Sequence, residues 1–324
     1  MTENASENAS PQKLQFRSLI SWLILVLSYS FLVYKLFTFN HYSELVNQLK
    51  QMPPSKLWWL VLILTLVPVN WIIESLKWKM LVAKVQKISL VKSFQAVLSG
   101  ISTGFFTPNR VGELVGRVLF LKTENRKAGV TLSLVNSLTQ NLMMALCGIP
   151  ACILFYIWKN EKMKLGIVMY LGILFFCLIL FGILYFTLPI LIRRIKLKKL
   201  ATKLLSYTAC LSDYSEMDLV RIMLITLLRY CVFCAQFYFM LFLFGVNLEI
   251  WQALIAIPTS YLFVSFTPSI AFSEAAVRSS YAVLIIGAFS TMEIPIMLAG
   301  VSIWFVNFVI PMLAGSIVLV KEKS

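Results

Sequence analysis

Two short stretches of the chain carry the same unusual set of residues. In each, Phe-Thr-Pro is followed a few residues later by Glu and, four residues after that, by Arg. Both copies lie in strongly apolar surroundings, one in each half of the chain. A proline-broken apolar segment with an ionisable pair, present in both halves, is typical of the binding site of a transporter. The residues are Phe106, Thr107, Pro108, Glu113 and Arg117 in the first copy and Phe266, Thr267, Pro268, Glu274 and Arg278 in the second.

The Glu and Arg of each copy are spaced to lie on one face of a helix. A charge left unpaired near the centre of a bilayer costs about 2.5–3.5 kcal/mol on insertion scales. We therefore expect both pairs to form and to face protein or a wet cavity. Two interpretations stay open, because the pairs either bind a ligand or only pin the segments in place. Arg110 has no Glu four residues later, so we expect it to be a free ligand for an anion.

The Thr-Pro dipeptides predict where a second half-helix begins in each copy. Thr107 and Thr267 are good N-caps, and Pro108 and Pro268 suit the first helical position. The free N–H groups and positive dipole end of each half-helix would then face the membrane interior. Such a helix end is a site for a phosphate or a carboxylate. A single copy would favour a simple kink in a packed helix, but two matching copies favour a site.

The composition predicts an all-α polytopic membrane protein. Of the 324 residues 59% are hydrophobic and 13% are charged, which is outside the range of soluble proteins. The net charge is +15, and the basic residues that produce it cluster in loops between apolar segments. They form no basic stripe interleaved with aromatic residues, so we expect no nucleic-acid partner. The only histidine is His41, and no phosphate-cradling loop, zinc spacing or nucleophile elbow is present. We therefore expect no enzyme, no metal and no cofactor.

Six apolar segments are long enough to span a bilayer. Two further segments, 94–121 and 251–286, are the ones that the Thr-Pro repeats break. Each could be one distorted span, or a re-entrant hairpin of two half-helices of roughly 13 residues joined by a turn. The predicted spans are Leu19–Phe37, Leu57–Leu76, Val130–Trp158, Leu165–Ile192, Leu219–Phe244 and Pro295–Val320.

Flanking charges favour the hairpins. Basic residues, Lys77 among them, lie on both sides of segment 94–121, whereas the flanks of segment 251–286 have no Lys or Arg. The first segment should therefore begin and end in the cytoplasm and the second outside, with both termini cytoplasmic. An eight-span bundle, the alternative, would place loops against this rule. The chain thus divides into a tail (1–16), a first repeat (17–158) with hairpin 94–121, an inverted second repeat (159–320) with hairpin 251–286, and a tail (321–324).

Other polar residues lie within the predicted spans. Glu74 and Arg229 are secondary candidates for the site, although both lie near span ends, where they can snorkel to the surface. The remaining ones more often form hydrogen bonds between helices than bind a ligand. They are Asn70 on the face of Glu74, Asn136 and Gln140 on the third span, Gln236 on the face of Arg229, and Asn307 on the sixth span.

Both broken segments resemble the transmembrane region of lysylphosphatidylglycerol synthases, a flippase-like family that also occurs as stand-alone membrane proteins. The resemblance rests on the stretch 102–113 with Arg117, and on 265–268 with Glu274 and Arg278. Two features that members of the family often have are missing. Where they have a glycine-rich turn after the second proline, this chain has Ile-Ala-Phe-Ser (270–273), and where they have Glu-Arg-x-x-Asp, it has Asn-Ser-Leu-Thr-Gln (136–140). Full synthases also carry a soluble aminoacyl-transferase domain that these residues lack, so we expect no lipid aminoacylation.

The resemblance implies a multi-pass protein of the cell membrane, in bacteria the inner membrane, that moves or presents a polar-headed lipid. The expected partner is a lipid with an anionic or polar head group, and a second copy of the chain or a lipid-modifying enzyme would fit as protein partner. The alternatives are a secondary transporter of a small anion, with Glu113 or Glu274 exchanging a proton, and a non-transporting membrane partner. The expected binding residues are Thr107, Pro108, Arg110, Glu113, Arg117, Thr267, Pro268, Glu274 and Arg278, with Glu74 and Arg229 second.

Overall fold

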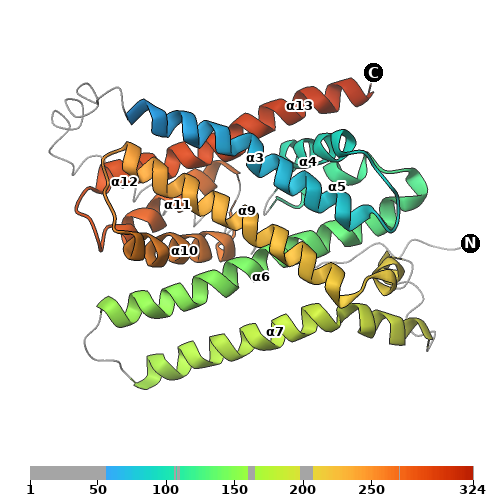
Figure 1. Cartoon of the computed structure of the whole chain (residues 1–324), viewed down its shortest axis with the longest axis horizontal. Helices are drawn as coiled ribbons and strands as arrows, with labels where there is room; N and C mark the ends of the chain where they lie inside the picture. Colours follow the sequence, from blue (N-terminus) through green and yellow to red (C-terminus); the bar gives the residue numbers. More distant parts are fainter. Residues whose placement is uncertain are drawn as a thin grey trace, which may run out of the picture.

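The computed structural model describes residues 56–105, 107, 110–159, 165–197, 207–269 and 271–323. In this part of the chain every regular element is a helix (Figure 1). The predicted first span, Leu19–Phe37, and the tail 1–16 lie outside the described residues, as does Pro108.

Among the described residues, five helical stretches are long and apolar enough to cross a membrane. Each overlaps one of the predicted spans and extends beyond at least one predicted end, where polar residues continue the helix. The large side chains exposed along α7 are almost all apolar, as a surface facing lipid requires. The stretches are α3 (Leu57–Val82), α6 (Arg126–Lys159), α7 (Leu165–Leu197), α9 (Glu216–Leu243), and α12 (Glu293–Trp304), which continues through a π-helical segment (Phe305–Val309) into α13 (Ile310–Lys323).

The first broken segment consists of two antiparallel helices, α4 (Leu90–Phe105) and α5 (Gly112–Val118). The hydroxyl of Thr103 on α4 donates a hydrogen bond of 2.8 Å to the carbonyl oxygen of Gly112 at the start of α5. Farther from the turn, Ser99 bonds the carbonyl of Gly116 at 3.2 Å. The segment is therefore a helical hairpin, with a second helix of 7 residues, shorter than predicted.

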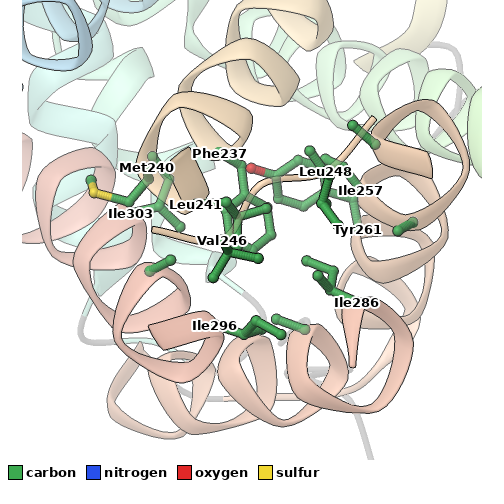
Figure 2. Packing of buried hydrophobic residues seen from close by; sticks show 14 of the residues in the cluster. Phe237, Met240, Leu241, Val246, Leu248, Ile257, Tyr261, Ile286, Ile296 and Ile303 are labelled. Carbon is green, nitrogen blue, oxygen red and sulfur yellow. The ribbon is translucent and has the colours of Figure 1, made fainter. Parts of the chain in front are cut away.

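The second broken segment is also a helical hairpin, formed by α10 (Ile250–Phe266) and α11 (Ala271–Ile286). The rings of Phe263 and Tyr281 stack across it with centroids 5.4 Å apart. Apolar residues of α9, α10, α11 and α12 converge beside this hairpin and fix its position (Figure 2). This cluster includes Phe237, Leu241, Ile257, Ile286 and Ile296.

The predicted N-caps were wrong in both hairpins. Thr267 ends α10, with φ −90° and ψ 118°, because the proline that follows excludes the helical conformation at this residue. Its hydroxyl donates to the carbonyl of Phe263 at 2.7 Å. In the first hairpin the residue before α5 is Val111. Thr107 nevertheless satisfies an N–H group of α5, because its hydroxyl accepts from Gly112 at 2.8 Å.

The ends of the two hairpins lie at opposite ends of α6 (Figure 1). Beside the start of α6, the side-chain oxygen of Gln86 accepts from the backbone N–H of Lys122 at 3.0 Å, which joins the two ends of the first hairpin. Beside the end of α6, Phe289 stacks on Trp158 at 4.2 Å and lies 5.8 Å from Trp251, which joins the ends of the second. The turns of the hairpins therefore point toward the middle of the molecule from opposite directions.

The close approach of α4 and α5 depends on glycine. A Cβ atom added to Gly116 would lie 2.2 Å from the hydroxyl of Thr103 and 2.6 Å from the carbonyl oxygen of Ser99. Small residues let membrane helices pack backbone to backbone in this way, which gives them van der Waals and hydrogen-bond contacts. The position of every charged residue on α5 thus depends on the lack of a side chain at this position.

We predict that Gly116→Ala lowers the stability of the protein by about 1–3 kcal/mol, the usual cost of overpacking. Gly172→Ala is the matched control, because no atom lies within 4 Å of its added Cβ. The control should keep the melting temperature or raise it, since alanine favours helix over glycine by up to about 1 kcal/mol. The measurement is thermal unfolding in detergent. Equal melting temperatures for the two variants would contradict the hairpin packing.

Candidate functional site

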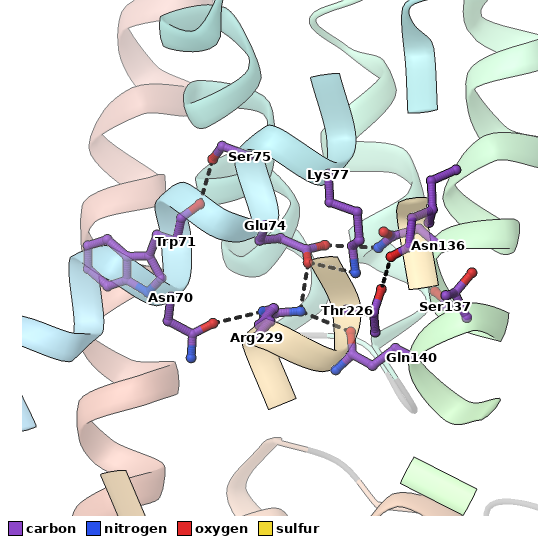
Figure 3. Close-up of polar contacts among 12 residues, drawn as sticks. Asn70, Trp71, Glu74, Ser75, Lys77, Asn136, Ser137, Gln140, Thr226 and Arg229 are labelled. Carbon is purple, nitrogen blue, oxygen red and sulfur yellow. Dashed lines mark hydrogen bonds and ion pairs between the residues drawn. The ribbon is translucent and has the colours of Figure 1, made fainter. Parts of the chain in front are cut away.

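Glu74 on α3 is fully buried and forms ion pairs with three cationic side chains, of which Figure 3 labels Lys77 and Arg229. Its oxygens lie 2.8 Å from Lys77, 2.7 Å from Arg117 and 2.8 Å from Arg229. The amide of Asn136 donates a further hydrogen bond of 2.9 Å. The partners come from α3, α5, α9 and α6, so this single carboxylate joins four helices that are distant in sequence.

The structure corrects two predictions about these residues. Lys77 is fully buried and does not belong to a cytoplasmic flank, because α3 continues to Val82 and turns this side chain inward. Glu74 and Arg229 do not snorkel either, since their side chains are 1% and 12% exposed. The spacing of three residues between Glu74 and Lys77 could have indicated this ion pair, because residues three apart share a helix face.

Arg229 is held by amides as well as by Glu74. Its Nε donates to Asn70 at 2.8 Å and its Nη1 to Gln140 at 3.0 Å. These are the hydrogen bonds between helices that the sequence predicted for such residues. With one carboxylate and two amide oxygens around it, the guanidinium of Arg229 has a fixed orientation.

A second ionic cluster joins the two hairpins. Glu274 on α11 binds Arg278 at 3.0 Å through one oxygen and Arg110 at 2.9 Å through the other. The pair of Glu274 and Arg278 is the predicted one, whereas Arg110, which was predicted to be unpaired, forms an ion pair with Glu274. Its partner lies in the opposite half of the chain. Arg110 also has φ 58°, a left-handed conformation that is uncommon for residues other than glycine.

The predicted pair of Glu113 and Arg117 is loose. Their charged atoms are 3.5 Å apart, whereas Arg117 lies 2.7 Å from Glu74. Arg117 is 3% exposed and Glu113 is 22% exposed. Arg117 thus belongs to the buried cluster, and Glu113 faces the space between the hairpins.

Phe308 touches the arginines of both hairpins. Its ring centre lies 3.7 Å from the guanidinium carbon of Arg110 and 5.2 Å from that of Arg278. Tyr261 faces Arg278 from another side at 5.3 Å. Phe308 belongs to the π-helical segment Phe305–Val309, and such segments are frequent at functional sites. No pattern in the sequence indicates Phe308, because nothing in an apolar span distinguishes one phenylalanine from another.

A cavity of about 410 Å³ lies between the two clusters. The polar side chains of Ser137, Gln140 and Asn141 line it, together with the aromatic rings of Phe233, Tyr261 and Phe308 and the turn of the second hairpin. Glu74 lies behind Arg229, outside the lining. The predicted site residues that line the cavity are Arg110, Glu113, Arg229, Thr267, Pro268, Glu274 and Arg278.

The formal charges of the two clusters do not balance. Five cationic side chains meet three carboxylates, Glu74, Glu113 and Glu274, which leaves an excess of two positive charges. Within the described residues no group of three or more His, Cys, Asp or Glu could hold a metal ion. Three of the five cations, all arginines, line the cavity, so a negative charge bound there would be compensated. The cations are Lys77, Arg110, Arg117, Arg229 and Arg278.

A family model described as the lysylphosphatidylglycerol synthase TM region matches residues 18–315. The chain belongs to this family. The match covers both hairpins and both ionic clusters, and it confirms the resemblance that the two broken segments indicate. Searches among curated proteins and among solved structures gave no match. With five apolar helices of spanning length, this member of the family is an integral membrane protein linked to lipid handling.

We predict that Glu74→Gln strongly destabilises this family member, because it leaves three buried cations without their shared carboxylate. Breaking a buried ion pair typically costs about 3–5 kcal/mol. Glu124→Gln is the matched control on an exposed residue, and Glu74→Asp should fall between the two. The readout is the fraction of folded protein after extraction and its melting temperature. If Glu74→Gln melted like the control, Glu74 would not hold the helices together.

Proposed function

We propose that this protein binds the polar head group of a membrane lipid in the cavity between the hairpins and moves or presents it across the membrane. The cavity carries the proposal, because it places charged side chains from both halves inside a bundle of apolar helices. Its volume falls within the range of small-molecule sites. A head group needs such polar contacts to leave the membrane surface, while its acyl chains stay in the bilayer. In this proposal the chain catalyses no covalent step.

The hairpins are re-entrant in this proposal and enter from opposite faces, as in an inverted repeat with three spans in each half. Two observations support this arrangement. Basic residues such as Lys87, Lys122 and Arg126 cluster where the first hairpin begins and ends, which favours the cytoplasmic side. Trp158 and Trp251 lie at the other end of α6, where aromatic residues favour a membrane interface. Both termini are then cytoplasmic.

The link between Arg110 and Glu274 joins the two hairpins at the wall of the cavity. If it opens, the two hairpins lose a contact that fixes their relative position. A head group that binds Arg110 and Arg278 would then be accessible from one side at a time as the halves move against each other. In this mechanism charged groups that line the cavity exchange their partners.

We predict that the purified protein in liposomes speeds the exchange of a fluorescent phospholipid between leaflets, measured by chemical quenching of the outer leaflet. Arg278→Ala should slow the exchange about tenfold, because a hydrogen bond to a charged group contributes about 1.5–3 kcal/mol. Arg221→Ala, on an exposed arginine of α9, is the matched control and should keep the wild-type rate.

Folded wild-type protein that exchanges lipid no faster than empty liposomes would contradict the proposal. The same liposomes test the small-anion alternative: uptake of phosphate or a carboxylate driven by a proton gradient, with no lipid exchange, would favour it.

A further inference from the structure

Arg278, which lines the cavity, has a buried donor without an acceptor. The side chain of Arg278 is 8% exposed and lines the cavity, and its Nη2 binds Glu274 at 3.0 Å. Its Nε has no hydrogen-bond partner. Buried donors of this kind are almost always satisfied, so an unpaired N–H on an arginine that lines a cavity can donate to an acceptor atom of a ligand.

The charges around the cavity indicate the sign of that ligand. Arg110, Arg229 and Arg278 line it, against Glu113 and Glu274. Both oxygens of Glu274 are already bound to arginine, and Glu113 lies 3.5 Å from Arg117. A cationic group would therefore meet three guanidiniums and a single loosely paired carboxylate, that of Glu113. An anionic group would compensate the excess of positive charge.

We propose that the ligand is a lipid whose head group carries a net negative charge on phosphate, and that its oxygens replace Glu274 on Arg110 and Arg278. This proposal rests on the proposed function and adds the class of lipid. Guanidinium groups bind phosphate oxygens through two parallel hydrogen bonds, which a single carboxylate shared by two arginines cannot offer to both. A phosphomonoester, with about −1.5 to −2 charges, matches the excess of two positive charges over both ionic clusters better than a diester does.

Phe308 has a positioning role in this site. Its ring lies beside the guanidiniums of Arg110 and Arg278, one from each hairpin, and keeps both available when Glu274 leaves. Cation–π contacts supply this attraction without occupying the N–H donors of the two arginines. The ring thus holds the arginines at the ligand site while their hydrogen bonds change partner.

The test measures binding of lipids with matched acyl chains to the purified full chain in detergent, by native mass spectrometry and by shifts in melting temperature. Phosphatidic acid should bind best, phosphatidylglycerol less well, and phosphatidylethanolamine or a cationic aminoacyl lipid at least about tenfold more weakly. Arg278→Gln should lose the preference for anionic lipids, and Arg278→Lys should weaken it. Arg221→Gln, with an exposed arginine, should keep it.

Equal binding of anionic, zwitterionic and cationic lipids would overturn the proposal and leave lipid transport intact. The proposal is also overturned if Arg278→Gln is folded, as judged by its melting temperature, and keeps the preference for anionic lipids. If Arg278→Gln does not fold, Arg278→Lys decides in its place. Inorganic phosphate or glycerol 3-phosphate that binds as well as phosphatidic acid would assign the site to a soluble anion, against both this proposal and the proposed function.

Discussion

Charges inside an apolar helix bundle must be paired, and this constraint determines how the helices of this protein meet. Each unpaired charge costs about 2.5–3.5 kcal/mol on insertion scales, so a few of them exceed the stability of most folds. Glu74 forms ion pairs with Lys77, Arg117 and Arg229, and Glu274 forms ion pairs with Arg110 and Arg278. Because most of these partners come from different helices, pairing the charges also assembles the bundle.

The two clusters have different consequences. Glu74 is sealed, fully buried and surrounded by donors, so it stabilises one arrangement of helices. Glu274 borders a cavity, and its arginines come from hairpins that approach from opposite directions. An anion that enters the cavity competes with Glu274 for the same donors. In the proposed mechanism the first cluster is the fixed part of the site and the second is the part that exchanges partners.

The sequence predicted the features that depend on residues close together in the chain. The apolar spans follow from hydropathy, and the pair of Glu274 and Arg278 follows from helical spacing. The contact of Arg110 with Glu274 joins residues from opposite halves, so no spacing rule could reveal it. Lys77 was assigned to a loop because its helix was predicted to end one residue earlier. Phe308 was missed because its role depends on two arginines that arrive from elsewhere.

The central claim is that two charged hairpins enter the membrane from opposite faces and pair in its interior. Single cysteines at the exposed positions 87, 124, 247 and 291, in a background without the native cysteines, test it most directly. Labelling with an impermeant maleimide in intact cells and in inverted vesicles should place 87 and 124 in the cytoplasm and 247 and 291 outside. Opposite sides for 87 and 124, or for 247 and 291, would make that segment a full span and contradict the account.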